Sequence, residues 1–169
     1  MPWIPKSKRF APRTKNEYVF MDEVAAVAAD GTPEPTAAEI SGGVWLTREV
    51  FSVDGFSTNT NFAQTSDAST FFIGKVPVSA EANDASMTFN ASEDGQDARQ
   101  VFEEGQRGYM YLAPSHAEGS IGEVYEVIVG AVSVVRDLND VQKVVVGFGV
   151  PSKPNQKFTI PTGITVPTA

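Results

Sequence analysis

The stretch GEVYEVIVGAVSVVRDLNDVQKVVVGFGV, residues 122–150, decides the fold of this 169-residue chain. It is rich in β-branched valine and isoleucine, and the turn-forming residues 137–140 (DLND) divide it into two runs. Two such runs joined by a turn predict a long β-hairpin. The second run alternates as a strand with one buried side does, and its uniformly apolar side consists of Val144, Val146, Phe148 and Val150.

The first run, residues 122–135, is mostly apolar on both sides, so both sides must be covered. In a two-layer domain, one side packs on the opposite sheet, and the other side needs a helix or another subunit. Gly130 lies in the middle of this run and indicates a bend or a bulge.

The rest of the chain predicts strands more often than helices. Gly74 and Pro77 interrupt one of these strands, which favours a sheet edge or a bulge. Residues 23–41 read as a loop, in which residues 22–29 fit either a helical turn or a continuation of the preceding strand. The small polar residues 55–69 read as a long loop or an irregular strand. We therefore expect a mainly β protein, a β-sandwich or β-barrel with one flanking short α-helix. The expected strands are residues 17–22, 44–53, 70–79, 85–91, 108–113, 122–136, 141–150 and 156–161.

The one expected helix covers about residues 95–104. Asp94 is a suitable N-cap, and Asp97 in the first turn suits the positive end of the helix. Gly105 follows at a position where glycine commonly ends a helix. The apolar stripe of this helix consists of Ala98, Val101 and Phe102.

The formal charge of −8 is unevenly distributed. The first 15 residues contain five basic and no acidic residues, whereas residues 17–126 contain 19 acidic and four basic residues. A body this acidic is a poor partner for DNA or anionic lipid. We expect residues 1–16 to form a basic N-terminal arm, residues 17–161 a single β domain, and residues 162–169 a flexible C-terminal tail.

The sequence offers few residues for catalysis. The absence of cysteine excludes a disulfide framework, a zinc ribbon and a thiol nucleophile. The only histidine, His116, lies in a predicted loop without a nucleophile elbow. Glu93, Asp94 and Asp97 are interpreted as helix-capping residues rather than as an acid–base pair or a calcium site. We therefore expect no enzyme, and no catalytic, metal-binding or cofactor-binding residues.

Targeting signals are missing as well. No apolar run approaches the ~20 residues that cross a bilayer. The N-terminal residues MPWIPKSKRF lack the apolar segment of a secretory signal. We expect no membrane association and a chain that begins near Met1 in a cytoplasm.

Several short motifs follow one another in a definite order between about residues 40 and 161. The motifs are a polar strand with an acidic turn (86–94), a short helix (97–104), a glycine–tyrosine junction (105–112), a valine-rich hairpin that opens with Gly122-Glu123 and closes with residues 144–149, and a last strand (157–161). This order resembles the major tail proteins, or tail tube proteins, of long-tailed bacteriophages.

The resemblance implies a structural virion protein without catalytic residues. Hexameric rings of such proteins stack into the tail tube, the conduit for genome delivery into the host bacterium. The implied partners are further copies of the chain, the tape-measure protein, and the tail-tip and terminator proteins. The phage DNA passes through a typically acidic lumen without specific binding, and the tail is assembled in the host bacterial cytoplasm.

Under this resemblance, we expect the basic arm and loops such as residues 55–69 to bridge neighbouring rings. We expect the arm to dock on the acidic body of an adjacent subunit, with its apolar residues as anchors. The expected inter-subunit contacts are Trp3, Ile4, Lys6, Lys8, Arg9, Phe10, Arg13 and Lys15.

Two alternatives remain at this point. The first is another ring-forming β-rich phage protein, such as a tail terminator or a head–tail joining protein. The second is a non-viral β-sandwich that binds a ligand and stays monomeric.

Overall fold

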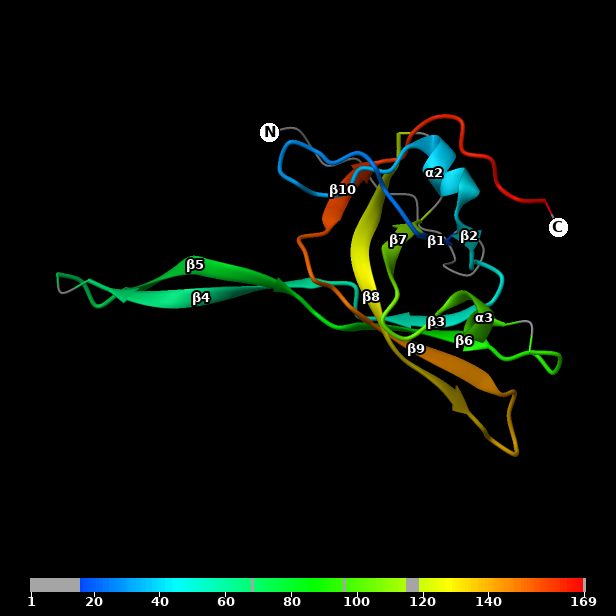
Figure 1. Cartoon of the computed structure of the whole chain (residues 1–169). Helices are drawn as coiled ribbons and strands as arrows, with labels where there is room; N and C mark the ends of the chain where they lie inside the picture. Colours follow the sequence, from blue (N-terminus) through cyan, green and yellow to red (C-terminus); the bar gives the residue numbers. More distant parts are fainter. Residues whose placement is uncertain (1–15, 68, 96, 115–118, 169) are drawn as a thin grey trace, which may run out of the picture.

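The computed structural model describes residues 16–67, 69–95, 97–114 and 119–168. The described chain is mainly β, with short helices (Figure 1). Its elements are β1 (Glu17–Met21), α2 (Ala37–Gly42), β2 (Val44–Trp45), β3 (Val50–Asp54), β4 (Thr58–Ser66), β5 (Ile73–Ala82), β6 (Ala85–Asn90), α3 (Ala98–Val101), β7 (Arg107–Ala113), β8 (Ile121–Val135), β9 (Lys143–Gly149) and β10 (Asn155–Thr159).

The large antiparallel sheet has the strand order β2-β1-β7-β8-β9-β6-β3, and β10 also pairs with β8. One large core joins residues from both ends of this sheet. Phe102, which follows α3, lies between them, because its ring centroid is 5.1 Å from that of Phe20 in β1 and 5.4 Å from that of Phe148 in β9. The sheet therefore folds over on itself, and the expected mainly β sandwich is confirmed.

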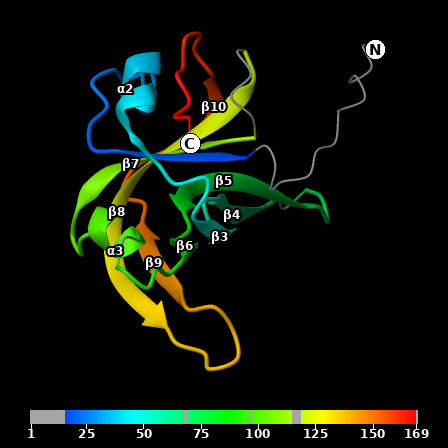
Figure 2. The ribbon, with the colours of Figure 1, turned by 90° about the vertical axis from the view of Figure 1, so that its right-hand side faces the viewer.

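The predicted hairpin is formed by β8 and β9, and β8 is the central strand. Its first half pairs with β7, up to Ile128 opposite Arg107, and its second half pairs with β9. The β8–β9 register shifts between Val129 and Val132, which confirms the bend or bulge predicted at Gly130. As a result, β8 runs the length of the body and curves along it (Figure 2).

A second, smaller core covers the other side of β1, β7 and the first half of β8. On that side, Val124 and Tyr111 are fully buried, and they belong to one cluster with Ile40 of α2 and Phe158 of β10. In this half of β8, both apolar sides are thus covered within the chain. The covering helix α2 lies in residues 23–41, where the expectation of a loop was wrong.

A capping box starts α2. The Thr36 hydroxyl accepts a hydrogen bond from the Glu39 backbone N–H (3.3 Å), and the Glu39 carboxylate accepts one from the Thr36 N–H (2.7 Å). Thr-x-x-Glu is the sequence signature of such a helix start. Because prolines at positions 33 and 35 lie immediately before this signature, residues 23–41 were interpreted as a loop.

The helix expected over residues 95–104 is wrong in its length and its cap. Only Ala98–Val101 is helical, and the N-cap is Asp97 rather than Asp94. At Phe102 the backbone becomes extended, because the ring of this residue is buried at the centre of the large core. Tertiary packing therefore ends the helix before its predicted glycine stop.

The strand expected over residues 44–53 is divided into β2 and β3. Between them the chain turns, and the Glu49 N–H donates to the Leu46 carbonyl oxygen at 2.9 Å. Leu46 is 4% exposed and belongs to the large core, so the turn is held by an apolar contact as well.

The largest departure from expectation is the hairpin of β4 and β5. The two strands pair from Thr58 opposite Ala82 to Ser66 opposite Ile73, and the hairpin projects away from the body (Figure 1). Most of residues 55–69 is therefore a regular strand. In β5, Pro77 lies beside a register shift, which confirms the bulge that its position predicted.

Candidate assembly surfaces

The described chain leaves several edges of the large sheet without a strand partner, including the short end strand β2, and two of these edges border the same four strands. β3 is the last strand of the sheet and pairs only with β6. The second half of β8, residues 130–135, pairs with β9 on one side, whereas the strand pairing with β7 on the other side ends at Ile128. Both edges present backbone N–H and C=O groups to a further strand, as open sheet edges do.

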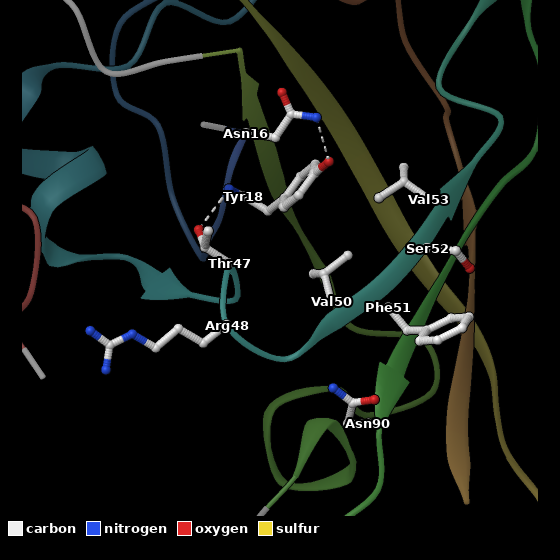
Figure 3. A pocket seen from close by; sticks show the side chains of 9 residues that line it. All are labelled: Asn16, Tyr18, Thr47, Arg48, Val50, Phe51, Ser52, Val53 and Asn90. Atoms are coloured by element: carbon white, nitrogen blue, oxygen red, sulfur yellow. Dashed lines mark hydrogen bonds between the residues drawn. The ribbon is translucent and has the colours of Figure 1, made fainter. Parts of the chain in front are cut away.

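A groove of about 680 Å³ runs along the β3 edge (Figure 3). Val50 and Val53 project from β3 toward Tyr18 of β1 and form an apolar floor (Figure 3). All three side chains are partly buried at the margin of the large core, so a strand added to β3 would cover them. The groove is lined by Asn16, Tyr18, Thr47, Arg48, Val50, Phe51, Ser52, Val53 and Asn90.

Hydrogen bonds hold Tyr18 in the wall of this groove. Its backbone N–H donates to the Thr47 hydroxyl at 3.1 Å, and its own hydroxyl accepts from Asn16 Nδ2 at 3.2 Å. The aromatic ring is therefore fixed in place before any partner arrives, which lowers the entropy lost on association.

The β4–β5 hairpin exposes apolar side chains. Every residue of β4 is exposed, and beyond it Phe71 is fully exposed and Phe72 is 77% exposed. The described part of the hairpin has four more large apolar side chains that are about half exposed or more: Phe62, Ile73, Val76 and Val78. Two strands on their own are only marginally stable in water, and exposed apolar clusters mark protein contacts.

A hydrogen-bond network fixes the root of the hairpin to the body. The buried Tyr125 hydroxyl donates to the Phe56 carbonyl oxygen at 2.6 Å and accepts from Gln156 Nε2 at 3.1 Å. The Gln156 side-chain oxygen accepts from the hydroxyl of Thr58, the first residue of β4, at 3.2 Å. Burial raises the pKa of Tyr125 to about 12, so the hydroxyl keeps its proton at neutral pH.

Asp97 fixes α3 in a similar way. Its side chain is 1% exposed and lies 2.6 Å from the Arg99 guanidinium. It also accepts hydrogen bonds from the backbone N–H groups of Arg99 (3.0 Å) and Ser92 (3.1 Å). The Arg99 side chain holds the pKa of this carboxyl well below its usual range. Asp97 is therefore a capping residue, as its interpretation from the sequence predicts.

The residues that the sequence nominated for subunit contacts, from Trp3 to Lys15, lie outside the described residues, as does His116. Asn16, the first described residue, lines the groove beside β3. The sequence analysis expected residues 55–69 to bridge rings but did not identify the hairpin that contains most of them. Its signal is the pair Phe71-Phe72, two consecutive aromatic residues directly after the small, mostly polar residues 57–70.

In the described part of the chain, no group of three or more His, Asp or Glu side chains is arranged to hold a metal ion. Among the helices that the structure describes, none is long and apolar enough to cross a membrane.

The open edges at β3 and at the second half of β8, together with a projecting apolar hairpin, are typical of a class of β-rich subunits that join copies of themselves. Comparison with protein families agrees with this class, because a family model described as phage tail tube protein matches residues 1–163. The chain belongs to the phage tail tube protein family, a structural component of the virion tail. A search of curated proteins finds no match.

Proposed function

We propose that this protein polymerises as stacked hexameric rings that form the tail tube through which the phage genome is delivered, and that it has no catalytic role. The observation that carries the proposal is the pair of open edges, β3 and the second half of β8. They lie at opposite borders of the half-sheet β8-β9-β6-β3. The β8 edge of one copy can therefore pair with the β3 edge of the next, a head-to-tail contact that closes into a ring.

Strand direction supports this pairing. The three neighbouring pairs in the half-sheet are all antiparallel, so β8 and β3 run in opposite directions. A β8 edge added to the β3 edge of the next copy continues the alternation without interruption. In a hexameric ring, about 24 strands spaced about 4.8 Å apart would close into a barrel at least about 37 Å across at the backbone. Such a barrel has room for a DNA duplex.

The hairpin and the N-terminal arm would join one ring to the next. The hairpin reaches beyond the body and carries the exposed Phe71 and Phe72, which need a protein partner. The arm, with Trp3, Ile4 and Phe10 as anchors and five basic residues, would dock on the acidic body of an adjacent copy.

The proposal also includes the proteins that the tube binds and the compartment in which it assembles. The lumen would hold the tape-measure protein before the DNA passes, and the ends of the tube would bind the tail-tip and terminator proteins. Assembly would take place in the host bacterial cytoplasm. The DNA would pass without specific binding.

A charge in the β3 groove tests the proposed ring contact. Val53→Lys places an ammonium group on the apolar floor that the next subunit would cover, whereas Val27→Lys changes a residue that is already 68% exposed elsewhere. We expect the wild type and Val27→Lys to form tubes under the electron microscope, and Val53→Lys to stay monomeric. Circular dichroism verifies that both variants fold.

The result that would overturn the proposed ring contact is a folded Val53→Lys variant that forms tubes as readily as the wild type. A wild-type chain that stays monomeric, or that stops at single rings under all conditions, would overturn the tube itself.

A further inference from the structure

The half-sheet β8-β9-β6-β3 has one covered side and one bare side. Met87, Phe89, Val144 and Val146 point into the large core and are completely buried. The alternate residues of the same strands point the other way, and the described chain leaves them partly or fully exposed. In paired positions, they are Ser86 and Gly147, Thr88 and Val145, Asn90 and Lys143, Ser133 and Val145, and Val135 and Lys143.

This bare side has few charges for so acidic a protein. Strands β6 and β9 and the second half of β8 contribute no carboxylate to it, and β3 contributes only Asp54, at its end. The one ammonium group, on Lys143, lies 2.8 Å from the carboxylate of Asp140, which opposes its charge, and 4.1 Å from the ring of Phe51. Hydroxyl, amide and small apolar side chains make up the remainder.

We propose that this bare side lines the lumen of the tube, and that the lumen wall is a nearly neutral, hydroxyl-bearing surface rather than an acidic one. The inference rests on the proposed function, since only ring closure gives the half-sheet an inside. If the ring closed with the other side inward, β1, β7 and α2 of every copy would fill the channel. The side of β1 and β7 that faces away from the large core is already covered by α2 and Phe158, so it offers no bare wall.

The chemistry of this wall suits the passage of a polyanion. DNA binds proteins mainly through basic groups on its phosphates, and the bare side offers Lys143 alone, already paired with an acid. Hydroxyl and amide groups keep a layer of water on the wall, and the small side chains leave the channel wide. In this account, the acidic groups of residues 17–126 other than Asp54 lie away from the bare side, and they act on the neighbouring rings and the arm instead of on the DNA.

Single cysteines test the placement, because the native chain has none. Thr88→Cys and Ser133→Cys lie on the bare side, and Ala38→Cys is the control on the exposed surface of α2. The probe is a maleimide attached to a folded protein too large to enter the tube. We expect all three variants to react as dissociated subunits, and only Ala38→Cys to react once tubes have formed.

Each outcome has a distinct meaning. Tubes in which Thr88→Cys and Ser133→Cys react as fast as in free subunits would overturn the lumen assignment and leave the tube intact. A failure of the wild type to form tubes would overturn the proposed function first, and with it the assignment.

A DNA-binding measurement tests the neutral character of the wall. Preassembled wild-type tubes mixed with a short DNA duplex at about 50 mM salt should sediment without it. Tubes of the Thr88→Lys/Ser133→Lys variant should carry the duplex down, and added salt should release it. Retention of the duplex by wild-type tubes, or its absence from tubes of the lysine variant, would overturn the neutral wall.

Discussion

Gly108 of β7 lies directly against β1, and no larger residue fits there. A methyl group at this position would collide with the ring of Phe20 and would lie 2.8 Å from the carbonyl oxygen of Met21. Phe20 is itself packed against Phe102, so it has little freedom to move away. The glycine–tyrosine junction noted in the sequence therefore has a packing role.

We expect Gly108→Ala to lower the free energy of unfolding by about 1–3 kcal/mol, because the extra methyl group overpacks the core. Gly42→Ala is the matched control, since a methyl group at residue 42 meets no atom within 4 Å. The control should unfold at the same denaturant concentration as the wild type or a slightly higher one. Equal midpoints for Gly108→Ala and the wild type would refute this account of the junction.

Asp97 gives a prediction about pH. Its folded pKa lies below its unfolded value, so the unfolded chain takes up a proton first as the pH falls. The stabilisation by this carboxylate is present above the usual aspartate pKa of about 3.9 and is lost as the pH falls from there through the folded value. Asp97→Asn should cost about 1–2 kcal/mol at pH 7, because the charged hydrogen bonds to Arg99 are weakened.

The difference in unfolding free energy between the wild type and Asp97→Asn should shrink as the pH drops below about 4. Urea denaturation at a series of pH values measures it, with Glu93→Ala as an exposed neighbouring control that should change stability by less than about 0.5 kcal/mol. A difference that stays constant down to pH 2 would show that the pKa of Asp97 is not lowered.

At the scale of elements, local sequence signals predicted the strands that lie in the core. Alternation predicted β6 and β9, the β-branched composition predicted β8, and the residue types glycine and proline predicted the bulges at Gly130 and Pro77. The expected helix was too long, since the burial of Phe102 ends it and no local signal reports that contact.

The hairpin of β4 and β5 could not be predicted in the same way. Its strands face solvent on both sides in the isolated chain, so their residues need no apolar alternation. The groove beside β3 was equally hidden, because Tyr18 and Val53 are brought together only by the fold. A surface that binds another copy of the chain is complementary to residues of that copy, so it produces no periodic pattern within a single sequence.

Truncation of the hairpin is the prediction at this scale. Asn59 and Glu81 are paired across the hairpin, so residues 60–80 can be replaced by a two-residue Asn-Gly turn. We expect the shortened chain to keep its thermal midpoint and its overall fold by circular dichroism, because β4 and β5 pair with each other and with no other described strand. Tube formation should be lost, since the exposed apolar residues are removed.

A full-length variant distinguishes the role of the hairpin tip in assembly from the role of its two strands. Phe71→Ser/Phe72→Ser keeps both strands and removes the two most exposed rings. If the tip carries the contact, this variant should assemble as poorly as the truncated chain under the electron microscope. Normal tubes from the truncated chain would contradict any role of the hairpin in assembly.

At the scale of the whole molecule, the charge distribution predicts how salt acts on assembly. In the proposed arm contact, the five basic residues among the first 15 would attract an acidic body, while the acidic bodies would repel one another. We expect the wild type to depolymerise as ionic strength rises, because salt screens the attraction of the arm. Light scattering or sedimentation at increasing salt concentration measures this.

Neutralising the arm should reverse the sign of the salt effect. With Lys6, Lys8, Arg9, Arg13 and Lys15 changed to glutamine, only repulsion between bodies remains, so salt should promote assembly. The control changes Lys75, Arg136, Lys153 and Lys157 to glutamine and leaves the arm intact, so it should lose tubes with salt as the wild type does. The same salt response in the arm variant and the wild type would contradict docking of the arm.

An electron cryo-microscopy map of the purified, assembled protein tests the central claim most directly. The account predicts hollow tubes of stacked rings, in which residues 130–135 of each copy pair antiparallel with β3 of its neighbour and the inner wall is one continuous sheet. Tubes whose subunits meet through other surfaces, with the β3 and β8 edges left open, would contradict it.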